Sequence, residues 1–198
     1  MKALLLIDFQ NDFGGFGTLA QPHVGSILET TPLFLEKEKF ALAIASQNWM
    51  PATHPIFAAN HFFRYPKQLV PINGKEERLW PIYGVQESFG ADWMAGFPVQ
   101  QMDRVLQKGL EEQVLPYSCF SSATSFDLHT YLQENAIEEL VLGGFLTEFA
   151  VAHTALDALE LGYEVTLVKE LCGAANLDSA EDGRAALEKL KKAGVQLQ

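Results

Sequence analysis

The stretch Leu-Val-Leu-Gly-Gly-Phe-Leu-Thr-Glu-Phe-Ala-Val, residues 140–151, decides the fold of this chain. It begins as an apolar run typical of a buried strand and continues through two glycines that allow a tight turn. Small and apolar residues then recur at helical spacing; they are Val151, Thr154, Ala155, Ala158 and Leu159. The stretch predicts a strand, a turn and a helix, with Ala150 in the first helical turn.

Position 150 has the surroundings of a catalytic nucleophile. The first turn of a helix carries unpaired backbone N–H groups and the positive end of the helix dipole, and both stabilise a thiolate or an oxyanion. Ala150 offers only a methyl group. The position therefore suits a nucleophile, and the nucleophile is absent.

The rest of the chain predicts an α/β fold. Continuous apolar runs indicate further buried strands at residues 3–7, 40–45, 104–106 and 165–168. Helical patterns lie at residues 24–35, 125–134, 147–161 and 179–192. Ser179 is the expected N-cap of the last helix, with Asp182 in an approximate capping box. Buried strands that alternate with helices favour a parallel sheet covered on both faces.

The length of 198 residues predicts one domain, residues 1–198. Residues 46–100 interrupt the alternation of strands and helices with most of the nine prolines and all three tryptophans. A long irregular excursion in a compact domain is usually a functional cap or a partner surface.

Charge and cysteine content limit the possible partners. Lys and Arg number 14 against 25 Asp and Glu, which gives a formal net charge of −11. This acidity argues against nucleic acid or an anionic membrane as partner. Two cysteines form no disulfide scaffold and predict a cytoplasmic protein. The apolar run at residues 3–7 stops at Asp8, so it predicts a first strand rather than a signal peptide.

Three positions converge at the ends of predicted strands. Asp8 follows the first strand, Lys108 follows the run at 104–106, and Ala150 follows the strand at 140–144. Ligands of open α/β sheets bind at the carboxyl ends of the strands. Alone, Asp8 would be expected in an Asx turn and Lys108 in a solvated turn; together the three positions predict one site.

The chain resembles the isochorismatase-like cysteine hydrolases, and within them the nicotinamidase branch. The resemblance runs nearly end to end and rests on segments 5–13, 45–51, 57–61, 80–86, 107–109, 117–120, 144–151 and 154–158, with His54 between the second and third. The family fold is a three-layer α/β/α sandwich with a six-stranded parallel sheet. The resemblance therefore implies this fold and a hydrolase site.

The resemblance also implies roles for individual residues. Asp8 matches the general base and later acid, and Lys108 the cation that polarises the site. The Leu146–Thr147 peptide matches a cis peptide that, with the N–H groups near Ala150, faces the substrate oxygen. Aromatic walls and neighbouring contacts for a flat substrate correspond to Phe13, Trp80, Gln10 and Phe149. Trp80 is equally expected as an ordinary core residue.

The departures from the family pattern are concentrated at the chemistry. Ala150 stands where the family has its catalytic cysteine. The family holds a metal with an Asp and three His, and the matching positions here are Asn48, Met50, His54 and Tyr83. One imidazole cannot hold zinc, iron or manganese usefully, so we expect no metal and no cofactor. We expect backbone or water partners for His54 and His61.

Three functional hypotheses follow. In the first, the chain is a family amidase whose cysteine has been replaced by alanine through engineering. In the second, it cleaves a vinyl ether as isochorismatases do, with Asp8 as general acid. In the third, it is a pseudoenzyme that binds a small ligand or a protein through residues 46–100. Neither Thr147 nor Cys119 is expected to replace the nucleophile: the Thr147 hydroxyl is expected to cap the helix that starts there, and Cys119 is expected to be a small buried thiol. We favour a hydrolase-family protein with altered or lost chemistry, acting on or binding a small planar acid or amide, and possible as a homo-oligomer.

Overall fold

The computed structural model describes all residues, 1–198, and its core is a six-stranded parallel sheet in the order β5-β2-β1-β6-β7-β8. The strands are β1 (Lys2–Ile7), β2 (Leu42–Asn48), β5 (Arg104–Lys108), β6 (Glu139–Phe145), β7 (Glu164–Gly173) and β8 (Gln196–Leu197). The predicted parallel sheet is confirmed. The strand order reverses beside β1. Because the strands are parallel, the carboxyl ends of β1, β2, β5 and β6 lie side by side along one border of the sheet.

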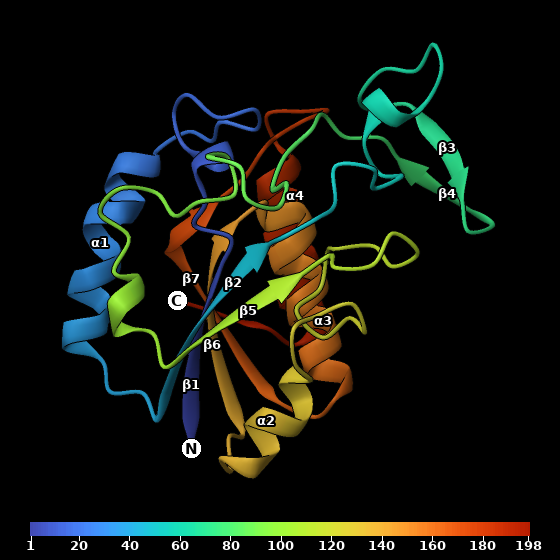
Figure 1. The fold of residues 1–198 in the computed structure, drawn as a ribbon. Coiled ribbons are helices and arrows are strands. Elements are labelled where there is room, and N and C mark those ends of the chain that lie inside the picture. The colour runs from blue at the N-terminus through green and yellow to red at the C-terminus, as the bar shows by residue number, and fades with distance from the viewer.

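Four helices complete the sandwich, which matches the expected three layers: α1 (Val24–Lys37), α2 (Leu128–Glu134), α3 (Ala152–Glu160) and α4 (Asp182–Ala193). Figure 1 shows α1 on one side of the sheet and α3 and α4 on the other. Because both faces are covered, β2 is buried along its whole length. This explains why its sequence is a continuous run rather than an alternating one.

Two helices begin later than the sequence predicts. The second begins at Leu128 because the Asp127 side chain caps it, accepting a hydrogen bond from Thr130 N at 2.8 Å. The last begins at Asp182, not near Ser179, so Ser179 is not its N-cap. Half of the expected capping box forms, since Asp182 Oδ2 accepts a hydrogen bond from Ser179 N at 3.0 Å.

The excursion between β2 and β5 carries a small lobe of its own. Its hairpin pairs β3 (Leu69–Ile72) with β4 (Lys75–Arg78) in antiparallel register. Beneath the hairpin lies a separate apolar cluster of Ala58, Val70, Ile72 and Leu79. The lobe projects from the body of the molecule at the upper right of Figure 1.

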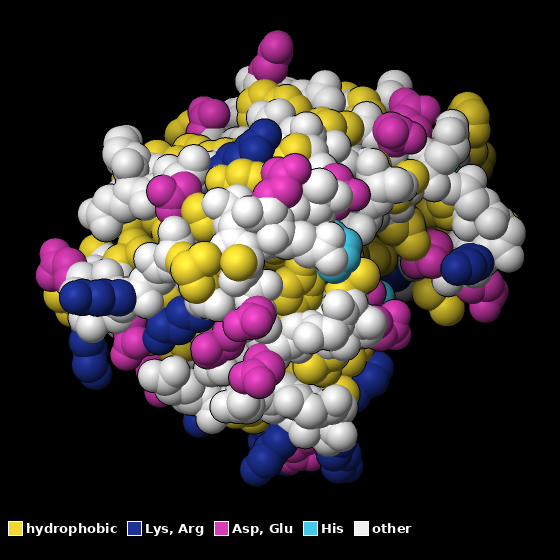
Figure 2. Space-filling view, turned by 90° about the horizontal axis from the view of Figure 1, so that it is seen from below, with side chains coloured by type: hydrophobic (Ala, Val, Ile, Leu, Met, Phe, Trp, Pro, Cys, Tyr) yellow, Lys and Arg dark blue, Asp and Glu magenta, His cyan; other side chains and the backbone are white.

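The main core contains 42 buried hydrophobic residues from the sheet and its covering helices. None of the helices is both long and apolar enough to cross a membrane. On the face seen in Figure 2, acidic and basic side chains are interspersed, and no basic patch appears there.

Gly144 tests the packing at the end of β6. Its φ is +145°, and a Cβ there would lie 2.2 Å from Ile7 O. We expect Gly144→Ala to lower the free energy of unfolding by about 3 kcal/mol or more, since both the backbone and β1 must shift. Urea unfolding followed by circular dichroism measures this.

Gly25, in the first turn of α1, is the matched control because a Cβ there meets nothing within 4 Å. Gly25→Ala should leave stability unchanged or raise it by up to about 1 kcal/mol. If both variants lost the same free energy of unfolding, the close packing of Gly144 against Ile7 would be contradicted.

Candidate functional site

Parallel register brings four polar side chains together at the carboxyl edge of the sheet. Ile7 of β1 lies opposite Ser46 of β2, and Asn48 of β2 lies opposite Lys108 of β5. Asp8 leaves β1 in the left-handed region, with φ at +61°. The sheet therefore gathers Asp8, Ser46, Asn48 and Lys108, of which the sequence predicted the first and last as a pair.

Asp8 and Lys108 form a buried ion pair, with Lys108 Nζ 2.8 Å from Asp8 Oδ2 and side chains at most 1% exposed. Asp8 Oδ1 accepts a hydrogen bond from Ser46 Oγ at 2.7 Å. Asp8 Oδ2 also accepts one from Asn48 Nδ2 at 2.8 Å. Both carboxylate oxygens are thus satisfied by the protein, as a buried charge requires.

Lys108 is equally saturated. Besides Asp8, its ammonium donates to Asn48 Oδ1 at 2.6 Å and to Pro116 O at 2.7 Å. An ammonium has three protons to donate, and here each has an acceptor. Asn48 therefore bridges the two charged groups, with its amide nitrogen toward Asp8 and its oxygen toward Lys108.

Gln10 belongs to the same network, and this corrects its expected substrate contact. Its amide nitrogen donates to Asn48 O at 2.9 Å and to Ala91 O at 2.8 Å. Its oxygen accepts a hydrogen bond from Asn48 N at 2.8 Å. The Gln10 side chain is fully buried and holds backbone groups in place, so it has no polar group left for a substrate.

Ala150 lies in the first helical turn after β6, where the sequence placed it. That turn, Thr147–Val151, is π-helical and leads into α3. Ala150 is buried, and its methyl group faces the core. The helical turn that the sequence predicted is therefore present, and residue 150 in it belongs to the core.

Two details of the turn differ from expectation. No peptide bond of the chain is cis, so the Leu146–Thr147 bond is trans; the chain reverses instead through Leu146 in the left-handed region, with φ at +59°. Thr147 does not cap the helix. Its hydroxyl donates to Gly173 O of β7 at 2.9 Å, which ties the turn to the sheet.

An aromatic cluster fills the space beside this turn. The ring of Tyr83 lies 5.8 Å from that of Phe13 and 5.8 Å from that of Trp80. Trp80 is buried, donates its indole N–H to Tyr117 Oη at 3.0 Å and contacts Phe149 edge-on. Tyr83 thus occupies the slot between the two predicted walls. Burial raises the pKa of Tyr83 well above its ordinary value, with Tyr117 and Asp8 adding to the shift, so it stays a neutral phenol.

Four positions of this chain match the metal ligands of the family that it resembles. The residues at these positions are not suited to hold a metal ion. Asn48 is engaged with Asp8 and Lys108, and Met50 is buried in the apolar core. His54 Nδ1 accepts a hydrogen bond from Ile56 N at 3.2 Å, and its Nε2 lies 3.3 Å from Val114 O. His61 Nε2 lies 2.7 Å from Pro55 O. The backbone partners expected for both imidazoles are confirmed.

Cys119, which the sequence excluded as a nucleophile, lies close enough to Lys108, Asp8 and Ser46 for them to act on its thiol. Its backbone N–H donates to Thr154 Oγ1 at 3.1 Å, which places it against α3. Burial raises the pKa of its thiol to about 11, although Lys108 and the Ser46 hydroxyl act in the opposite direction. A neutral, fully buried thiol is no nucleophile at physiological pH. Sequence reasoning also missed Ser46. It follows the predicted strand at residues 40–45, and that position was the signal that could have placed it in the site.

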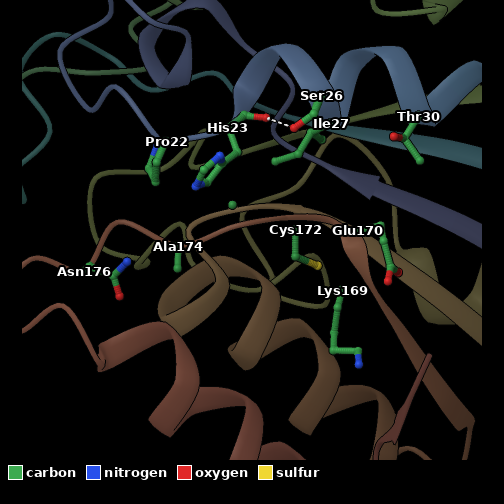
Figure 3. A pocket seen from close by; sticks show the side chains of 11 residues that line it. Pro22, His23, Ser26, Ile27, Thr30, Lys169, Glu170, Cys172, Ala174 and Asn176 are labelled. Atoms are coloured by element: carbon green, nitrogen blue, oxygen red, sulfur yellow. Dashed lines mark hydrogen bonds between the residues drawn. The ribbon is translucent and has the colours of Figure 1, made fainter.

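Two hollows are relevant to ligands. One, of about 380 Å³, is lined by Arg78, Tyr117, Phe149 and His153 among others, but not by Asp8, Lys108 or Ala150. A second, of about 460 Å³, lies between α1 and the end of β7; Figure 3 shows His23 and Ser26 facing Cys172 and Lys169 across it. Neither hollow is lined by the Asp8–Lys108 pair.

Comparison with known proteins agrees with this architecture. The family model described as Isochorismatase domain matches residues 2–198. The chain belongs to this family. A nicotinamidase of Escherichia coli is 33% identical over 203 residues, covering 99% of this chain and 93% of the relative. The yeast nicotinamidase bound to the inhibitor nicotinaldehyde superposes with a TM-score of 0.89 at 25% identity, covering 100% and 99% of the two chains. An Arabidopsis thaliana relative described as a probable inactive nicotinamidase is 26% identical over 87% of this chain and 81% of its own.

Asn48→Asp tests the bridge between the charged groups. The substitution replaces a donor 2.8 Å from Asp8 Oδ2 with a second carboxylate. We expect the free energy of unfolding at pH 7 to fall by roughly 3 kcal/mol, with a smaller loss at pH 5, because two adjacent carboxyls then share a proton. Gln101→Glu, an exposed amide-to-acid change, is the control and should change stability little. If Asn48→Asp left the free energy of unfolding at pH 7 unchanged, the hydrogen-bond network around Asp8 would not be closed.

His54 predicts a pH dependence of stability. Burial lowers the pKa of His54 in the folded protein, so the unfolded chain binds its proton more readily. Stability should therefore rise with pH between the lowered value and about 6.5, and be lost on acidification through that window. Burial lowers the pKa of His153 as well, with the same sign.

Urea unfolding at several pH values between about 5 and 8 checks this linkage. His54→Gln should flatten the curve in part, and the remaining slope then belongs to His153. A curve parallel to that of the parent would contradict the assignment to His54.

Proposed function

We propose that this chain is a non-hydrolytic member of the isochorismatase family, which binds a small planar acid or amide without cleaving it. The observations that carry the proposal are the closed network of Asp8, Asn48 and Lys108 and the methyl group at position 150, in the turn after β6. The nucleophile is absent, and the two groups that would serve it are saturated by other parts of the protein.

The saturation of Asp8 bears directly on acid–base chemistry. A general base must reach the proton that it removes with a free lone pair in suitable geometry. Ser46, Asn48 and Lys108 already donate to the carboxylate. Attack by an activated water or thiol would require at least one of these bonds to break inside a buried site.

The same contacts disfavour the vinyl-ether mechanism, in which Asp8 acts as the acid. A general acid must direct its proton at the substrate, whereas both oxygens of Asp8 are directed at Ser46, Asn48 and Lys108. An alanine introduced in place of a cysteine would explain position 150 alone. It would leave unexplained the Asn48 bridge and the Tyr83 ring between Phe13 and Trp80.

Binding is supported by what the chain retains. The aromatic side chains Phe13 and Trp80 both contact Tyr83, and Trp80 contacts Phe149, the residue that precedes Ala150. The yeast relative holds nicotinaldehyde, and a Leishmania infantum relative was solved with nicotinate. We take a planar ring with a carboxyl or amide group as the ligand class. In this proposal, Tyr83 fills the interior slot, so the ligand lies in the outer hollow that Tyr117, Phe149 and His153 line.

Assays of the parent protein test the proposal. Incubated with nicotinamide it should release no ammonia, and with isochorismate it should release no pyruvate, above a heat-denatured sample. The E. coli nicotinamidase serves as the positive control for ammonia release. Turnover of either compound that Asp8→Asn abolishes would overturn the proposal.

Ala150→Cys asks whether the missing thiol is the only defect. We expect no gain of nicotinamide hydrolysis, because Tyr83 fills the ring slot and the Asp8 carboxylate stays engaged. Circular dichroism and a thermal melt establish that the variant is folded. Ammonia release by this single variant would contradict the view that the whole site has been rebuilt.

A further inference from the structure

The aromatic lobe, defined as residues 57–78, presents its side chains from a folded support. It contains the β3–β4 hairpin and the small apolar cluster beneath it. Arg78 forms an ion pair with Asp178, and Lys67 donates to Leu177 O, so the lobe is tied to the segment after β7. Groups held this way lose little conformational freedom when a partner binds.

Large hydrophobic side chains gather on the outside of this lobe. The exposed fractions are 92% for Phe62, 95% for Phe63, 69% for Tyr65 and 58% for Leu69. Figure 2 shows hydrophobic side chains on the outer surface of the projection at its right. Single exposed apolar residues are ordinary, but several in one short segment mark an interaction surface.

Phe63 adds a backbone observation. Its φ is +54°, in the left-handed region that costs a non-glycine residue of order 1 kcal/mol. The almost fully exposed ring makes no intramolecular packing that offsets this cost. The strain therefore serves the outward placement of the ring, not the packing of the lobe.

Charge distinguishes the lobe from the rest of the molecule. No Asp or Glu occurs between Glu38 and Glu76, so the lobe holds only 2 of the 25 acidic residues of the chain, Glu76 and Glu77, both in β4. Arg64 and Lys75 are exposed and form no ion pair in the structure. A chain of net charge −11 thus carries one aromatic surface with unpaired cations.

We propose that the aromatic lobe docks on the acidic surface of a second copy of this chain. Contact between two lobes would place Arg64 of one copy near Arg64 of the other, which like-charge repulsion disfavours. A lobe against the acidic body of the next copy is complementary in charge and is a head-to-tail contact. Aromatic residues and arginine are the side chains that dominate interface energetics. The inference is independent of the proposed ligand binding.

Sedimentation velocity over a range of protein concentrations tests the proposal. The parent should self-associate, and the association should weaken with rising salt because complementary charges are screened. The double substitution Phe62→Ser and Phe63→Ser should weaken association at least about tenfold, and Arg64→Glu should weaken it as well. Both phenylalanines lie outside the core, so a thermal melt should leave the double variant as stable as the parent.

Phe16→Ser is the matched control, because Phe16 is a fully exposed phenylalanine outside the lobe. It should leave self-association unchanged. A parent that stays monomeric at every concentration would overturn the proposal, and so would unchanged association of the Phe62/Phe63 variant. A monomer that binds vesicles of anionic phospholipid through Arg64 would assign the lobe to a membrane surface and equally refute it.

Discussion

The buried ion pair between Asp8 and Lys108 is the constraint on which the rest of the site depends. Two charges at the edge of a covered sheet are tolerated only if every donor and acceptor around them is matched. Asn48 provides that match, because one amide can donate to the carboxylate and accept from the ammonium. Ser46, Gln10 and Pro116 complete the shell. The charged groups of the pair are therefore satisfied entirely by other groups of the protein.

The other departures from the family pattern place apolar or neutral side chains in the core near this network. Met50 and Tyr83, at two positions that match metal ligands of the family the sequence resembles, are apolar or neutral and lie in the core. Ala150 joins the same core cluster from the π-helical turn. Glycine at position 109 makes room for this packing, since a Cβ there would lie 2.6 Å from Met50 Cγ. The fold of the family is thus retained around a site whose residues differ from the family pattern.

The sequence predicted the parallel sheet, the four helices and the meeting of Asp8 with Lys108, because buried runs and strand-end positions are local signals. It missed the role of Asn48 as a bridge, which depends on the register between β2 and β5. It misplaced Gln10, whose partners lie far along the chain, at Asn48 and Ala91. The sequence identified Tyr83 only as a residue at a position that matches a metal ligand. Its place between Phe13 and Trp80 depends on how residues 46–100 fold.

The orientation of the Asn48 amide and the protons around Asp8 decide between a closed network and a working site. A neutron crystal structure at neutral pH would locate them directly. The account predicts the three Lys108 deuterons directed at Asp8, Asn48 Oδ1 and Pro116 O, the Asn48 amide deuterons directed at Asp8 and Gln10, and no deuteron on Asp8. A deuteron on the Asp8 carboxyl, or Asn48 turned with its oxygen toward Asp8, would contradict it.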